Sequence, residues 1–180
     1  MKKVLVVVDM QNDFVFDALK NTAAEAIIPH VAERIEQALA AGETVFFTRD
    51  THGPDYLDTQ EGRLLPVVHC IKGTRGWELV DALQKYAPRG QFVDKPAFGS
   101  VELARMLQAE NAAESIEEIT LLGICTDICV ISNAFLLKAH LPEARIIIDA
   151  AGCAGVTPES HLHALKAMQG CQMQIENLTE

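Results

Sequence analysis

The chain has 180 residues, of which 49% are apolar and 22% are charged, close to the average of soluble globular proteins. This composition excludes a disordered chain, a collagen-like repeat and a small disulfide scaffold. With 25 acidic and 15 basic residues the net charge is −10, which argues against binding to nucleic acids or anionic membrane surfaces. The length fits one domain, which we expect to cover residues 1–180.

Short β-branched runs alternate with longer helical patterns along the chain. In chain order, we predict strands at residues 3–8, 44–48, 91–94, 119–123, 145–149 and 171–175. Helices are predicted between them, at residues 27–41, 76–86, 101–110, 127–140 and 158–169. Several strands are apolar at consecutive positions, which indicates burial on both faces, as in a parallel sheet. The alternation therefore predicts a three-layer α/β/α sandwich, Rossmann-like, around a mainly parallel six-stranded sheet.

The N-terminus and the cysteines indicate the compartment. The first apolar run, residues 4–8, ends at Asp9, whereas a secretory signal needs roughly 7–15 apolar residues. No stretch approaches the roughly 18 apolar residues of a membrane span. The five cysteines are an odd number scattered through apolar runs, which is typical of a reducing environment. We expect a cytoplasmic protein in which one thiol has a chemical role.

Reactive side chains follow four of the predicted strands. Asp9 follows the first strand, Asp50 and His52 follow the second, and Lys95 follows the third. The fourth strand leads into a segment that ends at Cys129. Since ligands of an open parallel sheet bind beyond the carboxyl ends of its strands, we expect these side chains to meet at one edge.

Cys129, Lys95 and Asp9 suit nucleophilic chemistry. Cys129 lies near the start of a predicted helix, where free N–H groups lower a thiol pKa and can hold an oxyanion. A nearby Lys95 would favour the thiolate, and a partly buried Asp9 beside a lysine suits a proton shuttle. Taken singly, each residue has an ordinary alternative: a packing cysteine, a surface lysine and a turn aspartate.

A second cluster suits a metal ion. Asp50 and His52 can face one ion from a loop, and His69 can join them from a returning loop. Imidazole and carboxylate ligands suit zinc, iron or manganese. A fourth ligand could come from any of three acidic residues between the two histidines, namely Asp55, Asp58 and Glu61. The alternative is a loop histidine hydrogen-bonded to a neighbouring aspartate.

Three motifs together resemble the isochorismatase-like cysteine hydrolases, and most closely the nicotinamidase-type amidases within them. They are VVDMQNDF (residues 7–14), DK (94–95) and GICTDICV (123–130). The resemblance implies that Cys129 attacks an amide carbonyl to form a thioester, while Asp9 carries the thiol proton to departing ammonia and Lys95 stabilises the thiolate. It also implies a cis peptide between Ile124 and Cys125, and an oxyanion hole made by the backbone N–H groups of Cys125 and Cys129.

Residues 50–76 resemble the metal-binding loop of nicotinamidases. The resemblance implies that Asp50, His52 and His69 bind a divalent ion that holds a pyridine nitrogen. It favours Glu61 over Asp55 as the fourth ligand, because a related subgroup uses a glutamate in this loop. Isochorismate-cleaving relatives generally lack these ligands, so their presence beside Cys129 favours an amidase.

The chain also departs from the nicotinamidase pattern. Many nicotinamidases read Trp-Pro-x-His-Cys where this chain reads LPVVHC (residues 65–70), with one more residue and no tryptophan. Phe14 and Trp77 are therefore the remaining candidates for an aromatic contact with the substrate.

The leading hypothesis is an amidohydrolase that releases ammonia from nicotinamide or a similar small amide. One alternative keeps the same catalytic residues for a carbamoyl, ureido or isochorismate-like substrate. Another is a non-catalytic, flavodoxin-like module that binds an ion or ligand. Relatives are commonly dimers or tetramers, so the resemblance implies a homo-oligomer. The acidic net charge leads us to expect no nucleic-acid or membrane partner.

Overall fold

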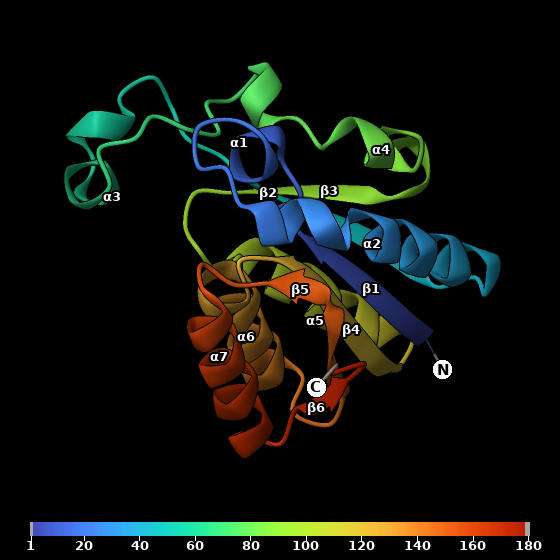
Figure 1. Ribbon diagram of the computed structural model, residues 1–180. Coiled ribbons are helices and arrows are strands. Elements are labelled where there is room, and N and C mark those ends of the chain that lie inside the picture. The colour runs from blue at the N-terminus through green and yellow to red at the C-terminus, as the bar shows by residue number, and fades with distance from the viewer. Residues whose placement is uncertain (1, 179–180) are drawn as a thin grey trace.

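The computed structural model describes residues 2–178 and contains a six-stranded parallel sheet in the order β3-β2-β1-β4-β5-β6 (Figure 1). Every adjacent pair of strands is parallel, which confirms the predicted α/β class. The strands are β1 (Lys2–Val8), β2 (Thr44–Asp50), β3 (Gln91–Lys95), β4 (Ile116–Ile124), β5 (Arg145–Ala154) and β6 (Gln174–Glu176).

Helices cover both faces of the sheet (Figure 1). The α-helices are α1 (Asn12–Val15), α2 (Thr22–Ala40), α3 (Gln60–Leu64), α4 (Asp81–Gln84), α5 (Val101–Ala113), α6 (Ile131–His140) and α7 (Pro158–Gly170). Short 3₁₀ turns are η1 (Tyr56–Asp58), η2 (Arg75–Trp77) and η3 (Ala87–Arg89), and η4 (Thr126–Val130) is a π turn. Helix α2 contacts α4, whereas α5, α6 and α7 form a contacting row. From β1 the chain adds β2 and β3 on one side of the sheet, and it then adds β4, β5 and β6 on the other side. Because right-handed crossovers in opposite directions lie on opposite faces, α2 and α4 cover one face, and α5, α6 and α7 cover the other.

The apolar strands form the centre of the core, as predicted. All five residues from Val4 to Val8 are at most 1% exposed, and Ile146 and Ile148 of β5 are 2% and 0% exposed. A strand with consecutive buried residues needs cover on both faces, and the helices supply it. Within residues 2–178, none of the helices combines the length and the apolar content that crossing a membrane would require.

The predicted helix at residues 76–86 is wrong. The chain forms the turn η2, then an extended stretch, and α4 begins only at Asp81. Side chains from α1 and the residue before it take the carbonyl groups that a helix would use. Gln11 Nε2 donates to the carbonyl of Trp77 at 2.8 Å, and Asn12 Nδ2 donates to that of Glu78 at 3.3 Å. Apolar residues of the segment are still buried, which explains the helix-like pattern.

Other boundaries also differ from the prediction: helix α2 begins at Thr22 instead of residue 27, and strand β4 begins at Ile116 instead of residue 119. The helix expected at residues 127–140 is divided into the π turn η4 and the α-helix α6. Strand β5 continues to Ala154, because its pairing with β4 resumes after an irregularity. The last strand begins at Gln174 instead of residue 171, since Gln172 adopts a left-handed conformation with φ of 67°.

The order of the strands brings four strand ends together. Val8 of β1 pairs with Thr48 of β2 on one side and with Gly123 of β4 on the other. Gly123 has φ of 117°, and a Cβ there would overlap the carbonyl oxygen of Val8, so only glycine allows this close approach. Strands β1 and β4 lie where the strand order reverses direction, the usual ligand position in such sheets.

Candidate active site and metal centre

One cavity of about 440 Å³ is bordered by members of both predicted clusters. Its lining includes Cys129 and Cys125 from the segment after β4, and Asp50, Glu61 and His69 from the predicted metal site. Most other lining side chains are apolar and include Phe14, Leu65, Phe98 and Ile128. The structure therefore joins a thiol and a metal-ligating cluster within one mostly apolar site.

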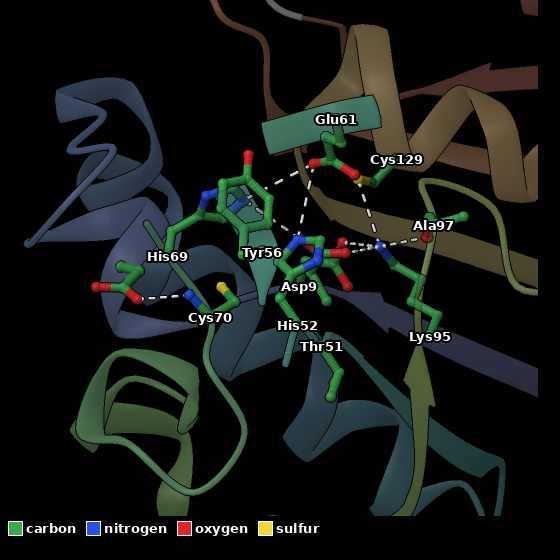
Figure 2. A network of polar contacts seen from close by, with 12 residues as sticks. Asp9, Thr51, His52, Tyr56, Glu61, His69, Cys70, Lys95, Ala97 and Cys129 are labelled. Atoms are coloured by element: carbon green, nitrogen blue, oxygen red, sulfur yellow. Dashed lines mark hydrogen bonds and ion pairs between the residues drawn. The ribbon is translucent and has the colours of Figure 1, made fainter. Parts of the chain in front are cut away.

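Lys95 connects the two clusters. It ends β3, is 0% exposed and directs its ammonium group into the site (Figure 2). Its Nζ lies 2.6 Å from Asp9 Oδ2, 3.3 Å from Asp50 Oδ1 and 3.5 Å from Cys129 Sγ. Burial opposes the charge of Lys95, but the charges of Asp9, Cys129 and Asp50 outweigh it and raise the pKa above its usual range. Lys95 is therefore a permanent cation in the site.

Asp9 faces the thiol from the end of β1. It is 0% exposed, and its Oδ1 accepts a hydrogen bond from the Thr48 hydroxyl at 2.6 Å. Its φ of 50° turns the chain away from the strand, a conformation that aspartate tolerates better than most residues. Burial raises the pKa of Asp9, while Lys95 and the Thr48 hydrogen bond act in the opposite direction. A carboxylate with a raised pKa is a better proton acceptor than an exposed one.

Cys129 is 6% exposed and lies in η4, immediately before α6. Burial and the negative charge of Asp9 raise the pKa of its thiol well above the ordinary value, with only Lys95 opposing them. Burial therefore favours the protonated thiol of Cys129 in the resting protein. The peptide bond between Ile124 and Cys125 is cis, as expected from the sequence resemblance. Burial also raises the pKa of Cys125 to about 12.

Asp50, His52, Glu61 and His69 form a compact donor cluster. One potential ligand atom from each residue lies within 4.8 Å of the others. His52 Nε2 is 2.9 Å from Asp50 Oδ2 and 3.7 Å from Glu61 Oε1. His69 Nε2 is 3.6 Å from Asp50 Oδ2 and 3.9 Å from Glu61 Oε1. Two imidazole nitrogens and two carboxylates fit a zinc, iron or manganese ion. Asp55 and Asp58 are exposed and lie outside this cluster.

Neighbouring groups orient the two imidazoles. His69 Nδ1 donates to the carbonyl of Val67 at 2.7 Å, which leaves Nε2 directed at the cluster. The ring of Tyr56 packs against both histidines, with centroid distances of 4.6 Å to His52 and 4.9 Å to His69 (Figure 2). Burial opposes a charge on His69, but the hydrogen bond with Asp50 outweighs it and raises the pKa of His69.

Asp50 belongs to both clusters. Its Oδ2 faces the two histidines, whereas its Oδ1 faces Lys95. Burial favours its neutral form, but the hydrogen bonds of His52 and His69 and the charge of Lys95 outweigh burial and lower the pKa below its usual value. The carboxylate of Asp50 therefore connects the potential metal site electrostatically with Lys95.

Gln11 is a positioning residue that the sequence reasoning missed. It is 0% exposed, and its Nε2 donates to the carbonyl of Asp50 at 2.9 Å while its Oε1 accepts from the N–H of Asp50 at 2.7 Å. This paired contact holds the backbone of Asp50 against the start of α1. The sequence does contain a signal for this role, because Gln11 is an uncharged polar residue shortly after a strand that is apolar from Val4 to Val8.

Of the two aromatic candidates for substrate binding, Phe14 lines the cavity and Trp77 does not. Phe14 lines the cavity, and its ring lies 5.5 Å from that of His69. Trp77 is not among the lining residues; its ring packs on the guanidinium of Arg49 at 3.7 Å, and its Nε1 donates to Thr51 at 2.8 Å. The structure thus brings Phe14 to the site and directs Trp77 to the other side of β2.

The fold and the position of the site are those of an α/β protein with its functional groups at the carboxyl edge of a parallel sheet. Residues 3–179 match the isochorismatase domain. The chain belongs to the isochorismatase family of hydrolases.

Solved structures support this assignment. A pyrazinamidase of Pyrococcus horikoshii in complex with zinc superposes with a TM-score of 0.84 at 26% identity, covering 99% of this chain and 100% of that one. The nicotinamidase PncA from Bacillus subtilis gives 0.83 at 30% identity, with 97% and 99% covered. An N-carbamoylsarcosine amidase from Thermoplasma acidophilum gives 0.79 at 26% identity, with 100% and 99% covered.

Proposed function

We propose that the protein is a cysteine-dependent amidohydrolase that releases ammonia from nicotinamide or a similar small aromatic amide. The observation that carries the proposal is the contact of Lys95 Nζ with both Asp9 Oδ2 and Cys129 Sγ, at 2.6 Å and 3.5 Å. A nucleophile, a base and a cation thus lie in contact, and the nucleophile Cys129 borders a largely apolar cavity. The zinc-bound pyrazinamidase and the nicotinamidase described above support the substrate class.

In the first half of the proposed reaction, Asp9 accepts the proton of Cys129 and the thiolate attacks the carbonyl carbon of the amide. Lys95 stabilises the thiolate and stays protonated throughout. The negative charge that develops on the carbonyl oxygen is bound by the backbone N–H groups of Cys125 and Cys129; one such donor is worth about 10²–10³ in rate in other enzymes. Asp9 then gives its proton to the amide nitrogen, which leaves as ammonia.

The second half regenerates the enzyme. Asp9, now a carboxylate again, accepts a proton from water, and the resulting hydroxide attacks the thioester of Cys129. The tetrahedral species collapses with release of the carboxylic acid, and the sulfur regains a proton from Asp9. Burial raises the pKa of Asp9, which makes it a better proton acceptor in this exchange than an exposed aspartate would be.

We propose further that Asp50, His52, Glu61 and His69 bind one divalent ion, with zinc, iron and manganese as candidates. When bound, such an ion would supply a Lewis-acid contact for the ring nitrogen of a pyridine carboxamide. Phe14, which borders both the cavity and His69, would pack against that ring.

Ammonia release by Cys129→Ala tests the function directly. We expect no release from nicotinamide above the uncatalysed rate, with the melting temperature of the wild type retained because alanine replaces a small buried side chain. Cys153→Ala is the matched control, since Cys153 is also a buried thiol but does not line this cavity. Full activity in Cys129→Ala would disprove the assignment of the nucleophile.

A carbamoyl or ureido compound is the second candidate substrate. The N-carbamoylsarcosine amidase relative favours it, as does Lys20, whose cationic side chain lines the same cavity and could face a substrate carboxylate. Comparing nicotinamide, pyrazinamide, N-carbamoyl amino acids and ureidoacrylate would decide between the two classes. A kcat/KM that is higher for the N-carbamoyl amino acids would replace the nicotinamide proposal while leaving the catalytic residues in place.

A further inference from the structure

A buried asparagine links the segment that carries Cys129 to the loop that follows Lys95. Asn133 lies in the first turn of α6 and is 1% exposed. Its Nδ2 donates to the carbonyl of Cys129 at 2.8 Å and to that of Phe98 at 3.1 Å. Its Oδ1 accepts a hydrogen bond from the N–H of Ser100 at 2.9 Å. None of the proposed chemical steps uses this side chain.

The three contacts require an amide at this position. Two carbonyl groups need donors and one N–H needs an acceptor, and a single planar amide of Asn133 satisfies all three. A carboxylate of the same shape would accept from Ser100 but would set an oxygen against both carbonyls. An aliphatic side chain would leave the three backbone groups without these partners in a buried place.

The loop held by Asn133 carries Lys95 at its beginning. Residues 96–98 are exposed, so little packing fixes them from outside. Lys95 Nζ donates to the carbonyl of Ala97 at 3.2 Å, which ties the ammonium group to the course of this loop. Asn133 anchors the end of the same loop at Phe98 and Ser100, and it anchors the backbone of Cys129 with the same amide group.

We propose that Asn133 is a positioning residue that keeps the lysine loop, residues 95–100, in register with Cys129. By bonding to both segments it keeps Lys95 Nζ next to the sulfur. This inference rests on the proposed cysteine hydrolase function. A displacement of about 1 Å between reacting groups can cost about 10²-fold in rate, so a remote amide can control the chemical step.

Two substitutions remove the contacts of the Asn133 amide in different combinations. Asn133→Asp keeps the shape and the contact with Ser100 but loses both donors. Asn133→Ala loses all three contacts without adding a charge. Ser132→Ala is the matched control, because it removes the 2.6 Å hydrogen bond from the Ser132 hydroxyl to the carbonyl of Ile128 in the same turn but leaves the three Asn133 contacts in place.

We expect kcat for nicotinamide to fall by about 10²-fold in both Asn133 variants, with KM changed by less than about threefold. Ser132→Ala should stay within about threefold of the wild type. Melting temperatures show that all assays are made on folded protein. Retention of wild-type kcat in either folded Asn133 variant would overturn the proposal, as would an equal loss in Ser132→Ala.

A second measurement does not depend on the substrate. Loss of the Lys95 contact should lower the alkylation rate of Cys129 by iodoacetamide about tenfold in Asn133→Ala, corresponding to about one unit in thiol pKa. The exposed Cys171 serves as the internal reference. If the wild type releases no ammonia from any amide tested, the proposed function is wrong. The alkylation rate of Cys129 then still tests whether Asn133 positions Lys95 beside the sulfur. An unchanged or faster rate at Cys129 would refute it.

Discussion

Lys95 holds together three groups that would otherwise repel one another. Asp9 and Asp50 are 0% and 2% exposed, and a thiolate at Cys129 would add a third negative charge beside them. One buried cation thus stabilises the fold at this edge of the sheet and also prepares the site for anionic chemistry. Both effects come from the same short contacts, so they should be lost together.

Lys95→Met tests the effect on stability. Removing the cation leaves Asp9 and Asp50 buried without their partner, which should cost about 3–5 kcal/mol at neutral pH in chelated protein, as measured by urea unfolding. The deficit should shrink as the pH falls and the carboxylates become neutral. Lys85→Met is the control, because the ion pair of Lys85 with Glu36 is exposed and its loss should leave the unfolding midpoint nearly unchanged. A Lys95→Met protein as stable as the wild type at neutral pH would contradict the electrostatic account.

The pH dependence of kcat/KM should be set by Asp9 on the acidic side. Burial raises its pKa above the ordinary 3.8, so the base becomes protonated at a higher pH than an exposed aspartate would. The rate should therefore fall as the pH drops through this raised value. Lys95 should add no alkaline limb below its ordinary 10.5, because its pKa is raised. A profile that stays flat down to about pH 4 would contradict Asp9 as the base.

At the scale of elements, the approach of β4 to β1 controls the site. Gly123 of β4 and Val8 of β1 pair directly, and the catalytic segments begin one or two residues later at Asp9 and Cys125. The conformation of Gly123, with φ of 117°, is one that side chains disfavour. Any shift at this pair would move Asp9 relative to the turn that carries Cys129.

Gly123→Ala should destabilise the protein by about 1–3 kcal/mol or more, because it combines an unfavourable φ with overlap against the carbonyl of Val8. Thermal unfolding measures this loss, and we expect amidase activity to fall with it. Gly170→Ala at the end of α7 is the control, since a Cβ there meets no atom within 4 Å. It should be neutral or stabilising by about 0.4–1 kcal/mol. Equal effects of the two substitutions would argue against a special role for Gly123.

Elements with a local signal were predictable, and those shaped by distant partners were not. Residues 4–8 are all apolar, and β1 (Lys2–Val8) contains this run after its two lysines, close to the predicted strand at residues 3–8. The pattern at 76–86 indicated a helix equally well, yet Gln11 and Asn12 bind its carbonyl groups from more than sixty residues away. Such competition depends on the arrangement of the whole chain, so no window of local sequence contains it.

For the molecule as a whole, the potential metal centre joins two parts of the fold. Asp50 ends β2 and His52 follows it by two residues, whereas Glu61 lies in α3, on an arm that extends away from the sheet (Figure 1). Its carboxylate nevertheless reaches the two histidines, within 3.7 Å of His52 and 3.9 Å of His69. A bound ion would therefore fasten this arm over the cavity as well as contact a substrate.

Metal content and thermal stability test this arrangement. Protein purified without chelator should contain about one divalent ion, and its removal should lower the melting temperature, since a ligand at 1,000 times its Kd stabilises by about 4 kcal/mol. Glu61→Gln should weaken binding, whereas Asp55→Asn, outside the cluster, should not. A stoichiometric ion that persists in both His52→Ala and His69→Ala would refute this ligand set.

The sequence by itself determined the α/β class, the parallel sheet and the set of residues at its carboxyl edge. These are local features, because each strand, each helix pattern and the residues after each strand can be identified in a short stretch of sequence. Ligands of a parallel sheet bind beyond the carboxyl ends of its strands, so Asp9, Asp50, Lys95 and Cys129 could be assigned to one site. The tertiary structure alone decided that Trp77 lies away from the cavity, which acidic residue completes the donor cluster, and that Asp50 serves two clusters. Each of these outcomes depends on the direction of side chains from segments far apart in the chain, which follows from how the layers pack.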